Sequence, residues 1–146
     1  MILKFEYKKL QFPQTSPITG NFVSRPLIPI HFKDTHTGNW IGYEMLLDSG
    51  ADWNILPAEF GELLGIDIKS GQKQIFGKID SGSFTAYFHD LELAVGGPDG
   101  HTFKVPTSFS YDVGDKDYGV LGQYGFFNKC TVKFDYVAKR IIEIKV

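Results

Sequence analysis

The sequence predicts a single, mostly β domain, and three observations lead to this class. Short apolar runs recur between turn signals along the whole chain. The 146 residues include 16 Gly, 13 Phe and 7 Tyr; glycine serves turns, whereas aromatic and β-branched residues favour strands. A chain of this length fits one domain and buries about 70% of the surface that it exposes when unfolded. We therefore expect a core that needs no metal or disulfide.

The first half of the chain predicts strands at residues 2–7 (ILKFEY), 26–32 (PLIPIHF) and 40–48 (WIGYEMLLD). A turn at 34–39 (DTHTGN) separates the second strand from the third. A short helix is predicted within 56–65 (LPAEFGELLG). Pro57 suits the first helical position, and Gly65 suits the end.

The second half begins with a predicted hairpin at 71–95, whose Gly-rich tip spans 77–83. After a turn at 96–100 (GGPDG), apolar residues alternate as a half-buried strand requires. A helical turn is possible at 123–128 (QYGFFN), and a terminal hairpin is predicted over 130–146. The alternating residues of the strand after the turn are Phe103, Val105, Phe109 and Tyr111.

Composition argues against several classes of function. The formal net charge is −2 and no basic stripe is present, so we expect no nucleic-acid partner. No apolar run approaches the roughly 18 residues of a membrane-spanning helix, and we expect a cytoplasmic protein. The histidines lack metal-ligand spacing and Cys130 stands alone, so we expect no metal, no cofactor and a passive core thiol. The histidines are His31, His36, His89 and His101.

The segment 43–57 (YEMLLDSGADWNILP) places Asp48 directly after an apolar run. One interpretation is an ordinary turn, in which the carboxylate caps nearby backbone N–H groups. The other is a functional acid, because a buried strand that ends in a carboxylate would bring a costly charge to the edge of the core. Ser49 offers a hydroxyl beside it, and Gly50 permits close approach of the backbone.

The stretch LLDSGADWNIL resembles the active-site segment of retropepsin-like aspartic proteases, single-domain counterparts of half a pepsin-like molecule. A second element, Val120-Leu121-Gly122 in GVLGQYGFF, follows about 70 residues later, as in that family. The resemblance covers 25–146 and leaves 1–24 as an N-terminal strand or extension. It implies a closed β-barrel with one or two short helices, including one after Gly122, and a two-fold homodimer.

The activity implied by the resemblance is peptide-bond hydrolysis by an aspartic endopeptidase, with a peptide or protein as substrate. Such chemistry uses two carboxylates that face one water, and Asp-Ser-Gly-Ala occurs once in this chain. A homodimer would supply Asp48 twice. Two carboxylates about 3 Å apart repel by roughly 5 kcal/mol at an effective dielectric constant of about 20, so the pair would share one proton.

The remaining roles also follow from the resemblance. Ser49, Gly50 and Gly122 would support the active site. The segment around 77–82 would form a flap that closes over the substrate and excludes water. The residues that would contact substrate are Ala51, Asp52, Trp53, Gly77, Lys78, Ile79 and Gly82.

Two positions depart from the family pattern. Gln123 stands where retroviral members often have an Arg that pairs with the acidic residue, here Asp52. Asn54 stands where Thr or Ser is common. These departures leave open an alternative, in which the fold serves as a catalytically weak or inactive module for peptide binding or dimerisation.

Overall fold

The computed structural model describes residues 1–77, 82–114 and 118–146, with the backbone alone for 12–14. The chain forms a single, mostly β domain, as predicted. The helical segments are α1 (Ala58–Leu63) and the short 3-10 helix η1 (Ile68–Ser70). The strands are β1 (Ile2–Glu6), β2 (Lys8–Ser16), β3 (Gly20–Arg25), β4 (Leu27–Lys33), β5 (Trp40–Leu47), β6 (Asn54–Pro57), β7 (Gln72–Gly77), β8 (Ser83–Val95), β9 (His101–Ser110), β10 (Gly119–Leu121), β11 (Thr131–Asp135) and β12 (Ile141–Lys145).

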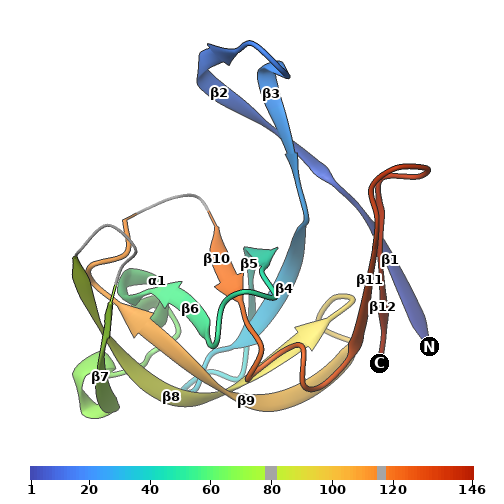
Figure 1. Cartoon of the computed structure of the whole chain (residues 1–146). Helices are drawn as coiled ribbons and strands as arrows, with labels where there is room; N and C mark the ends of the chain where they lie inside the picture. The colour runs from blue at the N-terminus through green and yellow to red at the C-terminus, as the bar shows by residue number, and fades with distance from the viewer. Residues whose placement is uncertain (78–81, 115–117) are drawn as a thin grey trace.

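Six strands close into a barrel in the order β4, β5, β10, β6, β9 and β8, because β8 also pairs with β4. Strand β7 continues the sheet outward from β8 as the second arm of a hairpin (Figure 1). Closure leaves few free strand edges within the barrel. The closed barrel with short helical segments confirms the predicted architecture.

The barrel encloses the hydrophobic core. Along β4, Ile28, Ile30 and Phe32 are fully buried, whereas Pro29 between them is exposed. This alternation follows from the pleat of a strand, which turns successive side chains to opposite faces. From β5, Met45 and Leu47 join the same cluster. The end of β5 is therefore anchored in the core immediately before Asp48.

Helix α1 forms where it was predicted, but Pro57 does not occupy its first turn. Pro57 ends β6 with an extended ψ of 138° and directly precedes the helix. The prediction for this residue was wrong because the pairing of β6 with β9 holds Pro57 opposite Ser110. Gly65 follows the helix with a φ of +78°, a left-handed conformation that glycine adopts without strain.

Two further predictions in the second half were wrong. Tyr111 lies beyond the end of β9 and is 43% exposed, and its hydroxyl donates a hydrogen bond to the Glu62 carboxylate. Residues 125–129 form turns and not the short helix expected after Gly122. Gly125 has a φ of +138°, which is incompatible with a right-handed helix.

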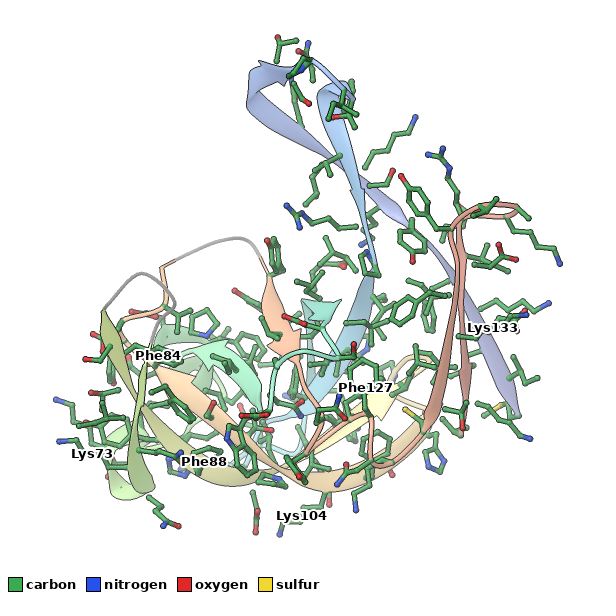
Figure 2. The ribbon with its side chains drawn as sticks, in the orientation of Figure 1. Lys73, Phe84, Phe88, Lys104, Phe127 and Lys133 are labelled. Atoms are coloured by element: carbon green, nitrogen blue, oxygen red, sulfur yellow. The ribbon has the colours of Figure 1, made fainter. Side chains whose placement is uncertain are left out.

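The chain ends form a separate three-stranded sheet in which β12 lies between β1 and β11. Strand β1 runs on past Tyr7 into β2, and β2 pairs with β3 as a hairpin that extends away from the barrel (Figure 1). Side chains of this hairpin stand apart from those of the barrel (Figure 2).

Among the described residues, none of the helical segments has the length and apolar character that crossing a membrane requires.

Candidate active site

The loop 48–53 joins β5 to β6 by crossing the end of β10. Strand β10 lies between them, parallel to β5 with Leu121 opposite Leu47, and antiparallel to β6 with Val120 opposite Ile55. Two strands that are neighbours in sequence are thus separated in the sheet by a strand from much later in the chain. This arrangement brings the Asp48 loop against Gly122.

Asp48 is half-buried at the point where β5 ends. Its backbone N–H donates to the carbonyl of Leu121 at 3.1 Å, and its carboxylate Oδ1 accepts the N–H of Gly50 at 2.9 Å. The Ala51 N–H donates to the Asp48 carbonyl at 3.1 Å, which closes a tight turn. One carboxylate oxygen is therefore oriented by the backbone of its own loop. Ser49 and Gly50 are exposed beside it.

Residues after β10 support the outer side of this loop. The backbone N–H groups of Gln123 and Tyr124 donate to the carbonyls of Ala51 and Asp52, each at 2.8 Å. The side-chain amide of Gln123 donates to the carbonyl of Ser49. Gln123 thus braces the Asp48 loop directly.

Asp52 is exposed and takes part in no ion pair with the described residues. Position 123 holds Gln and not a cation, so within the described part of the chain no cation there pairs with this exposed carboxylate.

Asn54 and Gly122 join the two loops inside the protein. The Asn54 side chain is fully buried, and its Oδ1 accepts the N–H of Gly122 at 2.9 Å. A Cβ atom on Gly122 would lie 2.6 Å from the carbonyl oxygen of Trp53, so only glycine fits there. No role was predicted for Asn54 beyond its departure from the family pattern. A polar residue beside the apolar Ile55 and Leu56 was the signal that it has a buried partner.

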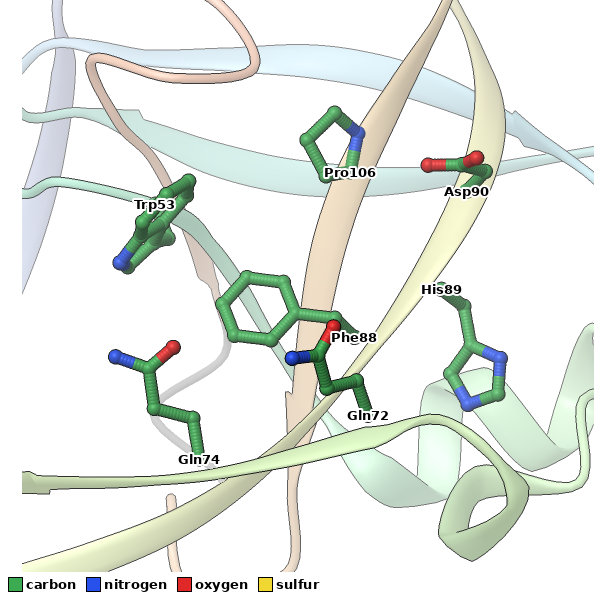
Figure 3. A pocket seen from close by; sticks show the side chains of 7 residues that line it. All are labelled: Trp53, Gln72, Gln74, Phe88, His89, Asp90 and Pro106. Atoms are coloured by element: carbon green, nitrogen blue, oxygen red, sulfur yellow. The ribbon is translucent and has the colours of Figure 1, made fainter.

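A pocket of about 500 Å³ lies between the Asp48 loop and the base of the β7–β8 hairpin (Figure 3). Trp53 forms one wall, and its ring lies 5.2 Å from the rings of both Phe88 and Tyr124, measured between centroids. Of the residues that line this pocket, only Trp53 was predicted from the sequence to contact substrate. The lining residues are Trp53, Gln72, Gln74, Phe88, His89, Asp90 and Pro106.

The predicted flap coincides with the β7–β8 hairpin, whose last described pair is Gly77 opposite Ser83. Gly77 and Gly82 are exposed, whereas Lys78 and Ile79 lie outside the described residues. The hairpin has an aromatic face. Phe76 stacks on Phe84 with centroids 5.0 Å apart and contacts Phe88 at 6.2 Å; Phe84 and Phe88 both come from β8 (Figure 2).

The described residues contain no group of three or more His, Cys, Asp or Glu side chains arranged to hold a metal ion. Burial raises the pKa of the Cys130 thiol to about 11, which disfavours the reactive thiolate.

The fold is similar to that of solved structures. The chain superposes on a retropepsin-like aspartic protease from Rickettsia conorii with a TM-score of 0.57 and 16% sequence identity, over 80% of this chain and 88% of that one. The chain has the retropepsin-like fold. EIAV protease complexed with the inhibitor HBY-793 aligns with a TM-score of 0.48 and 18% identity, over 75% of this chain and 88% of that one. No family model and no curated protein matches the sequence.

This retropepsin-like barrel therefore presents the Asp48 carboxylate on a braced loop beside an aromatic-walled pocket, with Asp52 exposed on the same loop. A single carboxylate can accept a proton from water. It cannot at the same time donate a proton, so a reaction that needs both steps requires a second acid.

Proposed function

We propose that the chain is an aspartic endopeptidase that acts as a homodimer, with Asp48 of each protomer forming the catalytic pair. One observation carries the proposal. In a retropepsin-like barrel, Asp48 ends a buried strand on a loop that Gly122, Asn54 and Gln123 hold in place. The carboxylate also accepts the N–H of Gly50, as a turn residue does, so the proposal is supported by the braced loop and the retropepsin-like fold taken together.

The proposed reaction follows from two carboxylates that share one proton. The ionised Asp48 accepts a proton from water, whose oxygen bonds to the carbonyl carbon of the scissile peptide. The protonated Asp48 of the second copy donates its proton to the carbonyl oxygen. As the carbon–nitrogen bond breaks, the first Asp48, now protonated, gives its proton to the leaving amine, and the second Asp48 takes a proton from a hydroxyl of the intermediate, which restores the shared proton. The two acids titrate as one unit, so the pH profile of activity would report the pair.

Substrate would lie between the Asp48 loop and the β7–β8 hairpin. The pocket beside Trp53 offers two aromatic rings and the amides of Gln72 and Gln74. This lining suits a substrate side chain with a sizeable apolar body. Asp52, exposed next to Trp53, would accept hydrogen bonds from the peptide backbone.

The test is cleavage of a broad peptide library by the wild type and by Asp48→Asn, followed by mass spectrometry at acidic and neutral pH. The substitution keeps the shape but removes the acid, so we expect a loss of at least about a thousandfold in rate. Asp99→Asn, in the exposed turn 96–100, is the matched control and should cleave at the wild-type rate. Equal cleavage by Asp48→Asn and the wild type would rule out the proposal.

Peptide binding without hydrolysis is the second candidate. It is favoured by Gln123, which bonds to Ser49 where retroviral members often have an Arg, and by Asn54 in place of Thr or Ser. Under this alternative, library peptides would bind with the same affinity to the wild type and to Asp48→Asn, and neither would release products.

A further inference from the structure

Residues 8–25 form an arm made of β2, β3 and the turn between them. Within the described part of the chain, these two strands pair with each other and with no other strand. Ile18 near the tip is 90% exposed and Phe22 is 49% exposed. A two-stranded hairpin alone in water is only marginally stable, so the arm has the character of an element that packs against something else.

The base of the arm is fixed at the same end of the barrel as Asp48. The carbonyl of Pro26, one residue after the arm, accepts the N–H of Leu47 at 3.0 Å, and Leu27 pairs with Leu46. Asp48 is the next residue after Leu47. The arm therefore starts beside the catalytic loop and projects away from the barrel (Figure 1).

Contacts on both strands hold the arm in this direction. On the β2 side, Lys8 forms an ion pair with Glu44 of β5. Just before it, the Tyr7 N–H donates to the carbonyl of Arg140 at 3.0 Å, and the rings of Tyr7 and Tyr136 meet edge to face at 5.3 Å. The base is thus anchored to the barrel and to the terminal sheet, whereas the outer part is uncovered.

The arm also differs in charge from the rest of the chain. It contains three basic residues, Lys8, Lys9 and Arg25, and no acidic residue. The rest of the chain has the other 12 of the 15 Lys and Arg and all 17 Asp and Glu, a balance of −5. Lys8 is held by Glu44 of its own chain, but Lys9 and Arg25 leave the base of the arm cationic and complementary to the body of a second copy.

We propose that each arm lies against the other protomer of the dimer and covers the face beside its Asp48 loop. The inference rests on the proposed function, because only a dimer that joins two Asp48 loops brings a second body to the base of the arm. Under two-fold symmetry the contact occurs twice. Ile18 and Phe22 supply apolar area near the tip, and Lys9 and Arg25 at the base favour the acidic partner.

Sedimentation velocity over a concentration series tests the inference. The perturbing variant combines Ile18→Asp and Phe22→Asp, and we expect it to raise the dimer dissociation constant about tenfold or more. Val137→Asp is the matched control, because Val137 is 95% exposed and lies outside the arm; its dissociation constant should equal that of the wild type. A second variant replaces residues 10–23 with Asn-Gly, which can turn between the paired Lys9 and Ser24.

The outcomes separate the two proposals. A wild type that stays monomeric up to about 100 µM, well above typical specific affinities, would overturn the dimeric endopeptidase itself. A dimeric wild type whose dissociation constant is the same in both arm variants, each shown to be folded by circular dichroism, would overturn the role of the arm alone. A photoreactive benzoylphenylalanine in place of Ile18 should cross-link to a second copy. Cross-linking within one chain, or only to added peptide, would also overturn it.

Discussion

Replacing Gly122 by Ala tests whether the two loops of the site are locked together. The added Cβ would lie 2.6 Å from the carbonyl oxygen of Trp53 and 2.7 Å from its carbonyl carbon and nitrogen. Ordinary non-bonded contacts lie near 3.5–4.0 Å. These neighbours are backbone atoms. The carbonyl of the adjoining Asp52 accepts a hydrogen bond from the Tyr124 N–H at 2.8 Å. The backbone at Trp53 therefore cannot move away from the added Cβ without disturbing this hydrogen bond.

Two costs follow from this overlap. Overpacking costs about 1–3 kcal/mol. If Gly122 moves away from Asn54, its buried N–H loses the 2.9 Å hydrogen bond, at about 1–3 kcal/mol more. We expect a total of about 3 kcal/mol. For a chain of this size that lowers the melting temperature by about 6–12 °C.

The assay is urea unfolding followed by tryptophan fluorescence, at one fixed protein concentration because dimerisation would add to apparent stability. Gly114→Ala is the control, since nothing described lies within 4 Å of its added Cβ; its stability should stay within about 1 kcal/mol of the wild type. A Gly122→Ala protein with the wild-type midpoint would show that the loops are not locked as described.

Two further predictions concern ionisation. The hydrogen bond from Tyr111 to Glu62 raises the pKa of Tyr111 to about 12. The substitution Glu62→Gln should therefore return this pKa towards about 10. The measurement is a titration of tyrosinate absorbance, with Tyr111→Phe to identify which transition belongs to Tyr111. Because the pKa of Tyr111 is higher in the folded than in the unfolded protein, this contact stabilises the protein fully below about pH 10, and its contribution disappears as pH rises through about 12. An unchanged tyrosinate titration in Glu62→Gln would contradict the contact. Since burial raises the pKa of Cys130 to about 11, its alkylation at neutral pH should be much slower in the folded protein than in urea, and equal rates would contradict the assigned burial.

Local sequence patterns predicted the features that depend on neighbouring residues in the sequence. An apolar run ending in Asp48 predicted a buried strand followed by a half-buried acid. Gly65 predicted the end of a short helix, because a left-handed residue there stops further helical hydrogen bonds. In both cases the determining residues are close together in sequence.

Features that depend on distant residues were not predictable from local patterns. Gln123 looked like the loss of an ion pair with Asp52, but its side chain bonds to Ser49, 74 residues away. Asn54 was recognised only as a departure from the family pattern, yet its Oδ1 accepts the N–H of Gly122 from inside the barrel. The arm was missed because nothing in residues 8–25 indicates which segment they pair with.

The position of β10 between β5 and β6 has a consequence for how the protein is made. During synthesis, residues 40–57 leave the ribosome long before Leu121. Strands β5 and β6 therefore lack β10, which pairs with both of them, until it has been translated. Pairing across such a separation is slow because the intervening chain must first be ordered. The nascent chain therefore carries Asp48 on a loop without its β10 support until Leu121 has emerged.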